Sequence, residues 1–254
     1  NEEVAKAVHR PYNKKNFVKN IGLLNNAGVI FGLDLIFGLP LDTFKSFKES
    51  VDFAVSLYPN NLEIFCLSVL PGTDLYDRSQ ELNLTFENEP PYHVLHTDRF
   101  SAQELNVSQK IANGCNIFYN NGRAVPWFNT ICHAAKIRPN AFFLQFYQWL
   151  ESQKNQNSVN QDIFSYYAHL KHKEVEKLQL KFVEFLFNQK KLNRLYNAAC
   201  DIITFNGAIS RKTDTGVSEK VKLHYPVEYI DSEYSLDLEF FVQNVKIKSS
   251  EIRI

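Results

Sequence analysis

Two stretches near the start of the sequence, residues 32–40 and 67–76, each join an apolar run to a Gly/Pro turn that opens a helical pattern. A strand that ends in a turn and a helix is the repeating unit of α/β folds, whose ligands bind in loops at the carboxyl ends of parallel strands. The pair therefore predicts two β/α units. The almost unbroken apolar run over residues 29–37 also predicts a strand buried on both faces.

Helical patterns surround these strands. Residues 14–26 place apolar side chains at the spacing of one helix face, and residues 42–43 are suited to cap a following helix. A second buried strand is predicted over residues 62–70, after which Thr73 or Asp74 caps a short helix that runs to about Leu82. The front of the chain thus alternates strand and helix twice.

The rest of the chain reads mostly as helix. Ser101 and Glu104 form a capping-box pattern that predicts a helix to about residue 119. Further helices are predicted over residues 125–136, 140–152, 162–188 and 191–204, with a polar linker over residues 154–160. Alternating polar and apolar residues over 220–230 and 235–247 predict a solvent-facing antiparallel β-hairpin at the C-terminus.

Composition limits the classes of function. The 254 residues include 28 Lys and Arg and 28 Asp and Glu, so no net positive charge attracts nucleic acid. No apolar run approaches the roughly 20 residues of a spanning helix, and no secretion signal is visible, so we expect a cytoplasmic protein without a membrane partner. The chain opens inside a helical pattern, and we expect it to be a fragment of a longer protein.

The cysteines predict no metal site. Cys66, Cys115, Cys132 and Cys200 are each more than four residues from the next, which excludes a zinc-type or cluster-type pair by spacing. We interpret them as structural thiols, since disulfides are rare in cytosolic chains.

At the residue level the chain resembles radical SAM enzymes, most closely the cobalamin-binding-domain type with a helical C-terminal region. The fifth barrel strand of that family commonly ends in Asp-x-Ile-x-Gly-Leu-Pro-Gly-(Asp/Gln)-Thr, and the matching residues here are Asp34, Ile36, Gly38, Leu39, Pro40, Asp42 and Thr43. The sixth strand commonly ends in Leu-Pro-Gly-Thr-x-(Leu/Met)-Tyr, and the matching residues are Leu70, Pro71, Gly72, Thr73, Leu75 and Tyr76. Residues 89–97 resemble the family's following loop, and residues 1–12 resemble the helix after strand four.

This resemblance implies the architecture. Residues 1–100 would be the C-terminal part of a TIM-like α/β barrel, 101–205 a helical region, and 206–254 a β-rich tail packed on it. It also implies S-adenosylmethionine and a [4Fe–4S] cluster as cofactors of the longer protein, with cobalamin bound by an upstream domain. The cofactor-binding positions that it implies here are Asp34, Ile36, Gly38, Val69, Leu70 and Pro71, the last three through backbone contacts with the adenine.

Two features depart from the family pattern. The cluster ligands Cys-x₃-Cys-x₂-Cys are absent, so this chain alone is not expected to perform radical chemistry. Leu41 stands where the family usually has Gly, which argues against a left-handed backbone at that residue.

Several candidate residues have a structural alternative. Asp34, a carboxylate inside an apolar strand, would contact the cofactor or substrate, or would be satisfied by a neighbouring strand or the loop at residues 38–40. Gly38 and Gly72 would admit either a ligand or the following helix. His93 and His96 have a separation suited to two metal ligands, but without a third ligand nearby a role on the surface or in loop packing is favoured.

Two further patterns are interpreted as structural. His169 and His172 lie on a charged helix and are expected on its solvated face. The aromatic series Phe142, Phe143, Phe146, Tyr147 and Trp149 has helical spacing and is expected in a core.

The sequence thus predicts the C-terminal part of a radical SAM enzyme acting on an unknown substrate. The alternative is a helical module, over about residues 101–254, that docks a substrate or partner without a catalytic role. An open sheet with missing strands would expose edges, which favours pairing of two copies.

Overall fold

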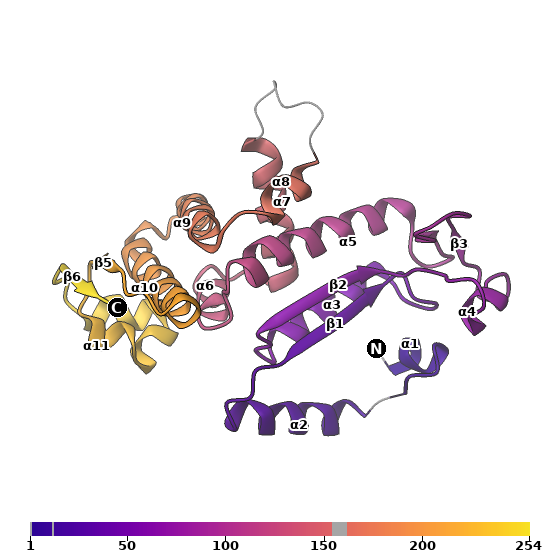
Figure 1. Ribbon diagram of the computed structural model, residues 1–254, viewed down its shortest axis with the longest axis horizontal. Helices are drawn as coiled ribbons and strands as arrows, with labels where there is room; N and C mark the ends of the chain where they lie inside the picture. Colours follow the sequence, from indigo (N-terminus) through magenta and orange to yellow (C-terminus); the bar gives the residue numbers. More distant parts are fainter. Residues whose placement is uncertain (1, 12, 154–161) are drawn as a thin grey trace. The chain divides into compact units, whose positions relative to one another are not determined.

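The computed structural model describes residues 2–11, 13–153 and 162–254 (Figure 1). Within these ranges the fold is mixed α/β and mostly helical, with three two-stranded sheets. The chain divides into two compact units, unit 1 (Asn1–Cys115) and unit 2 (Asn116–Ile254). The polar linker predicted over residues 154–160 lies outside the described residues.

Unit 1 contains the two predicted β/α units. Its elements are α1 (Glu2–Ala7), α2 (Lys14–Asn26), β1 (Gly32–Phe37), α3 (Phe44–Val55), β2 (Asn61–Cys66), α4 (Asp74–Asp77), β3 (Thr85–Phe86), β4 (Val94–His96) and α5 (Ala102–Cys115). β1 and β2 are parallel and in register from Gly32↔Asn61 to Phe37↔Cys66, and α3 connects them (Figure 1). This strand–helix–strand unit is the part of the sequence prediction that the structure confirms most directly.

One face of this sheet packs against helices. The Phe37 ring lies 5.3 Å from the ring of Phe47 on α3, and the Cys115 thiol of α5 approaches the Leu62 carbonyl at 3.6 Å. Phe47 in turn contacts Phe100, which is fully buried just before α5. These contacts form the core of unit 1.

The other face of the same sheet is open. Ile36 on β1 is 40% exposed and its register partner Phe65 on β2 is 49% exposed. Burial therefore alternates along β1, and the predicted burial of this strand on both faces is wrong for the described residues. The apolar run was correct as a strand signal, but no described element of unit 1 shields this face from solvent.

Unit 2 is built mainly from helices. Its elements are the π-helix η1 (Asn116–Asn121), α6 (Phe128–Ala134), α7 (Pro139–Gln153), α8 (Ile163–Ala168), α9 (His172–Gln189), the 3₁₀ helices η2 (Asn193–Leu195) and η3 (Glu233–Leu236), α10 (Tyr196–Thr215), β5 (Lys220–Leu223), α11 (Val227–Ile230), α12 (Leu238–Asn244) and β6 (Ser250–Arg253). The helix predicted over residues 162–188 is interrupted between α8 and α9.

An aromatic cluster forms the core of unit 2. The Phe118 ring has neighbouring ring centroids at 4.8 Å (Phe142), 4.9 Å (Phe146) and 6.1 Å (Phe182). All four rings are fully buried. The prediction that the aromatic series on residues 142–149 belongs to a core is confirmed.

The C-terminal tail is not the predicted hairpin. β5 and β6 pair antiparallel, but helices α11, η3 and α12 occupy the sequence between them. Residues 227–230 and 238–244 are helical where alternation predicted strands. Asp201 on α10 anchors this tail, since its buried carboxylate accepts hydrogen bonds from the backbone N–H groups of His224 (2.7 Å) and Tyr225 (2.8 Å). Tertiary contacts therefore override the period-two pattern.

The structure confirms the α/β class that the sequence predicted, but it does not show the predicted partial barrel. The described sheets form no closed barrel, since β1 and β2 pair only with each other. The division of the chain at residues 100 and 205 stays a prediction. In the described ranges no helix combines the length and the apolar character that crossing a membrane requires.

Candidate functional site

The candidate site lies where β1 and β2 end. Because the strands are parallel and Phe37 is in register with Cys66, the two Gly/Pro loops that follow leave the same edge of the sheet. Loops at this edge are the usual ligand sites of parallel α/β folds. The structure thus brings the two motifs together at one edge of the sheet.

Asp34 lies on the open face of the sheet. Its side chain is exposed, and no described residue donates a hydrogen bond to it or forms an ion pair with it. Its register partner across the sheet is Glu63, which accepts a hydrogen bond from Asn61 at 2.9 Å. Two carboxylates therefore lie side by side on one surface, and the alternative in which the fold itself satisfies Asp34 is not seen in the described residues.

Gly38 is required by packing. It adopts φ +81°, and a Cβ at this position would lie 2.5 Å from Val94 Cγ1 and 3.2 Å from Leu105 Cδ2. A side chain is therefore excluded by β4 and α5 as well as by the backbone angle. The predicted neighbour was the following helix, whereas the elements that approach Gly38 are β4 and α5. Contact of Gly38 with a ligand stays a prediction.

The backbone at Leu41 corrects the sequence prediction. Leu41 adopts φ +64°, the left-handed conformation that its side chain was expected to forbid. Such a residue costs about 1 kcal/mol relative to glycine. Next to it, buried Asp42 accepts hydrogen bonds from the Thr43 N–H at 2.9 Å and from the Ser46 hydroxyl, and Thr43 caps α3. The capping contacts hold the loop in place despite the strained residue.

The segment after β2 leaves two backbone groups without a partner among the described residues. The N–H of buried Val69 donates to the Tyr92 carbonyl at 2.9 Å, and the Leu70 carbonyl accepts from Thr73 Oγ1 at 2.7 Å. Among the described residues, none pairs with the Leu70 N–H or with the Val69 carbonyl. Pro71 has no N–H, so one free donor and one free acceptor stand next to each other on this loop.

Gly72 completes the turn after β2. It adopts φ +80°, and no atom lies within 4 Å of where a Cβ would be. The turn conformation alone therefore accounts for glycine here. Thr73 then caps α4 through the Tyr76 N–H at 3.2 Å, as the sequence predicted.

The histidines of the Pro-rich segment do not form a metal site with other described residues. His93 hydrogen-bonds through its backbone N–H to Glu87 at 3.1 Å, and His96 is exposed at the end of β4. Residues three apart on a strand point to opposite faces. Within residues 2–11, 13–153 and 162–254, no group of three or more His, Cys, Asp or Glu side chains could hold a metal ion.

The four cysteines are free of disulfides, and three of them lie in environments that disfavour the thiolate. Burial raises the pKa of Cys66 to about 11, and it likewise raises the pKa of Cys200 to about 11. Complete burial raises the pKa of Cys115 well above its ordinary value. Cluster ligation needs thiolates, so these environments oppose it.

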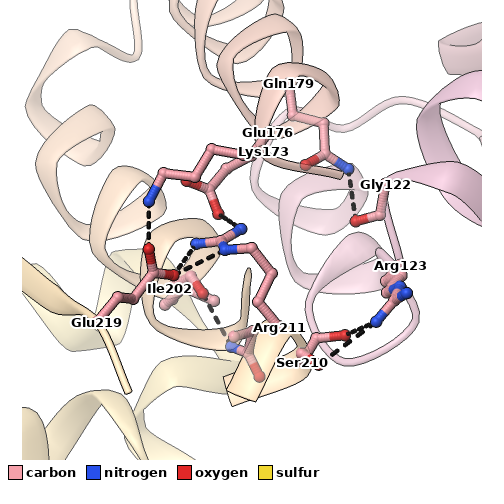
Figure 2. Close-up of polar contacts among 10 residues, drawn as sticks. Gly122, Arg123, Lys173, Glu176, Gln179, Ile202, Ser210, Arg211 and Glu219 are labelled. Carbon is pink, nitrogen blue, oxygen red and sulfur yellow. Dashed lines mark hydrogen bonds and ion pairs between the residues drawn. The ribbon is translucent and has the colours of Figure 1, made fainter. Parts of the chain in front are cut away.

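Unit 2 contains a cluster of charged side chains that the sequence did not predict (Figure 2). Arg211 on α10 donates to buried Glu176 on α9 at 2.5 Å, and to Glu219 through its Nε at 2.7 Å. Lys173 forms a second ion pair with Glu219. Burial raises the pKa of Glu176 above its ordinary value, while its ion pair with Arg211 acts in the opposite direction.

Beside this cluster, two glycines, Gly122 and Gly207, lie too close to neighbouring atoms to carry a side chain. The side-chain amide of Gln179 donates to the carbonyls of Phe118 at 2.8 Å and of Gly122 at 3.0 Å (Figure 2). A Cβ on Gly122 would lie 2.2 Å from the carbonyl oxygen of Phe118. A Cβ on Gly207 would lie 2.0 Å from the carboxylate of Glu176. The sequence signal was the pair of polar residues on the apolar face of α9. Because its carboxylates are paired and no nucleophile is present, we interpret the cluster as structural.

His172 corrects a second prediction. Its Nδ1 is buried and has no hydrogen-bond partner among the described residues, whereas a solvated position was expected. Burial lowers the pKa of His172 to about 4, and the positive charges of Arg123 and Arg211 add to that effect. His169 is exposed, as predicted.

Comparison with known proteins gives a family and one curated relative. Residues 80–213, just over half of the chain, match the family described as "Protein of unknown function (DUF4080)". The chain is also similar to "Heme chaperone HemW" of Buchnera aphidicola subsp. Schizaphis graminum (strain Sg), with 24% identity over 119 residues. That match covers 47% of this chain and 31% of the relative, so it spans about a third of the relative's length.

Proposed function

The chain belongs to the DUF4080 family, and we propose that it is the C-terminal part of a radical SAM iron–sulfur enzyme. The longer protein would cleave S-adenosylmethionine reductively at a [4Fe–4S] cluster to act on a substrate that is not identified. This chain would supply the last β/α units of the barrel and the helical region that follows. The haem-chaperone activity named for HemW belongs to that whole protein, of which this chain matches 31%.

The observation that carries the proposal is the juxtaposition of the two family-like strand ends. The β1 and β2 loops leave one sheet edge, and the adjoining sheet face is open to solvent at Asp34, Ile36 and Phe65. A face with apolar and carboxylate side chains that stays uncovered in unit 1 fits the inner wall of a barrel whose other strands come from elsewhere.

The loop after β2 suits an adenine. Adenine presents both hydrogen-bond donors and acceptors along its edges. The unpaired N–H of Leu70, a half-exposed residue, would supply a donor, and the unpaired carbonyl beside it belongs to Val69, which is buried. Backbone groups of this kind would recognise the base without any particular side chain.

The residues present do not fit the cluster itself. The cysteines are scattered, and burial raises the pKa of Cys66, Cys115 and Cys200. No described group of side chains could hold a metal. The cluster ligands, and any cobalamin site, would therefore lie in a part of the longer protein outside this chain.

The test is to extend the chain upstream. We would express the coding sequence together with the segment that precedes residue 1, reconstitute it anaerobically with iron and sulfide, and measure the cluster absorbance and the formation of 5′-deoxyadenosine. We expect both signals from the extended protein and neither from the chain alone. If the extended protein shows no cluster absorbance and no cleavage, the proposal is wrong.

Asp34 provides a residue-level control within that test. Asp34→Asn in the extended protein is expected to weaken S-adenosylmethionine binding or turnover at least tenfold with the cluster absorbance retained. Glu49→Gln removes the same charge from an exposed position on α3 and should leave both unchanged. Equal effects of the two substitutions would remove the assigned role of Asp34.

A second candidate role concerns unit 2. This unit is compact in its own right and has a buried aromatic core, but the described part of it has no candidate metal or nucleophilic site. We propose that it docks the substrate or a partner for the enzyme. Deleting residues 116–254 from the extended protein should then abolish substrate turnover and spare S-adenosylmethionine cleavage.

A further inference from the structure

Unit 2 contains a cavity of about 320 Å³, open on its surface side, between α6, α10 and the α11–η3 segment. Its wall is partly apolar, with Ile202 and Phe205 from α10 and Ile230 from α11. The volume is at the small end of the range for ligand pockets and is enough for one long side chain. α11 packs on α10, so the wall is part of the folded unit (Figure 1).

The segment that forms the mouth of this cavity is strongly acidic. Residues 226–240 contain five Asp or Glu residues and no Lys or Arg, although the chain as a whole is neutral. Of these carboxylates, Glu239 pairs with Arg194 and Asp237 caps α12. Asp231 and Glu233 line the cavity, and no described residue forms an ion pair or a side-chain hydrogen bond with either of them. Two carboxylate residues without a charged partner therefore line one cavity.

Exposed aromatic rings continue the surface beyond the cavity. The Tyr234 ring lies 5.6 Å from the ring of Tyr229 and 5.5 Å from that of Phe240, and the three side chains are 38–48% exposed. Leu236, at the cavity mouth, is 61% exposed. A contiguous exposed patch of aromatic and aliphatic side chains marks an interaction surface.

We propose that this surface binds a protein segment by inserting one Arg or Lys side chain into the cavity. The aliphatic stem of that residue would lie on the apolar wall, and its charged end would reach Asp231 and Glu233. The neighbouring Tyr and Phe rings would receive the flanking residues and favour the cation. A peptide fits better than a free small cation because the ring surface extends outside the cavity, and the acidic charge disfavours nucleic acid.

This inference rests on the docking role proposed for unit 2, and it gives that role a chemical class of partner. It does not depend on the cluster or on S-adenosylmethionine. A failure of peptide binding would therefore leave the radical SAM proposal intact, and absence of a cluster in the extended protein would leave this site intact.

The test uses the whole 254-residue chain and two pools of fluorescein-labelled nonapeptides. Both pools are randomised around a fixed central residue, which is arginine in one pool and its neutral isostere citrulline in the other. Fluorescence anisotropy at low and high salt measures binding. We expect the arginine pool to bind at least tenfold more tightly, with the difference reduced by salt.

Variants separate the cavity from the general charge of the segment. Asp231→Asn combined with Glu233→Gln should weaken binding of the arginine pool at least tenfold. Glu228→Gln removes a charge from an exposed residue of the same segment that does not line the cavity, and it should change binding less than twofold. Unchanged thermal melting would show that both variants are folded.

Four results would overturn the proposal. These are absence of binding by either pool, equal binding of the citrulline pool, an effect of Glu228→Gln as large as that of the double variant, and binding of free arginine methyl ester as tight as that of the peptide pool. The last result would assign the cavity to a small cation instead of a protein segment.

Discussion

The open sheet face of unit 1 and the core of unit 2 differ in how far their aromatic side chains are buried. In unit 2, Phe118 lies among other buried rings, and its polar neighbours are paired. In unit 1, Phe65 and Ile36 lie on a sheet face that is open to solvent. Unit 2 therefore has a closed core, whereas the two-stranded sheet of unit 1 has one face open to solvent. The comparison separates side chains that stabilise the fold by burial from side chains that are available for contact.

The largest expected effect compares one phenylalanine from each unit. Phe118→Ala should destabilise unit 2 by about 4 kcal/mol, because it removes a fully buried ring and leaves a cavity. Phe65→Ala should cost less than about 1 kcal/mol, because the ring is already half in water. Both tryptophans lie in unit 2, so urea unfolding followed by tryptophan fluorescence reports on that unit alone. Hydrogen exchange of β2 amides reports on unit 1. A small loss for Phe118→Ala would contradict the closed core.

The next comparison concerns two aspartates. Asp201→Asn should destabilise unit 2 by about 2 kcal/mol, since the amide can no longer accept all the hydrogen bonds from His224 and Tyr225. Asp34→Asn should change stability by less than about 0.5 kcal/mol because no described residue pairs with this carboxylate. Urea unfolding measures the first and hydrogen exchange of β1 the second. Similar losses in both variants would mean that Asp34 has a structural partner after all.

A pH comparison follows from His172. Burial lowers its pKa to about 4 in the folded protein, so the unfolded chain binds the additional proton as pH falls from about 6.5 toward 4. The contribution of His172 to stability is present above pH 6.5 and is lost over that interval, amounting to about 2 kcal/mol after allowance for partial exposure. His172→Gln should flatten this part of the pH–stability curve, and the exposed control His169→Gln should not. A slope that is unchanged in His172→Gln would show that other groups cause it.

The smallest expected effect lies in the β1 loop. Leu41→Gly should stabilise unit 1 by up to about 1 kcal/mol, because glycine removes the penalty of φ +64° at a modest entropic cost. Leu41→Ala keeps the Cβ and should bring no gain. Thermal melting followed by hydrogen exchange of α3 and β1 would detect the difference. A destabilised glycine variant would indicate that the exposed Leu41 side chain makes contacts that matter more than the backbone strain.

Sequence patterns predicted the structure correctly where interactions between neighbouring residues determine it. The strands at residues 32–37 and 61–66, the caps at Thr43 and Thr73, and the aromatic core helix α7 were all indicated by the sequence. Turn residues and side-chain periodicity act over a few neighbouring positions, and such signals survive in the folded chain.

The sequence predictions that the structure overturned share another cause. The strand pattern over residues 235–247 gave way to helix α12, where Leu238 and Phe241 are buried. The Nδ1 atom of His172 is buried, and Leu41 adopts a left-handed backbone held by the capping contacts of its neighbours. Each outcome depends on residues distant in sequence or on the energy of a whole loop, which periodicity does not contain.

The sequence by itself determined the β/α alternation of residues 29–82, the motifs at the two strand ends, and the absence of a cysteine triplet. Only the tertiary structure decided which face of the β1–β2 sheet stays open. It also decided that Glu176, Arg211 and Glu219 pair within unit 2, and that Asp231 and Glu233 stay unpaired at a cavity. The reason is that hydrogen-bonding and turn preferences are local, whereas burial and charge pairing are set by which distant segments meet.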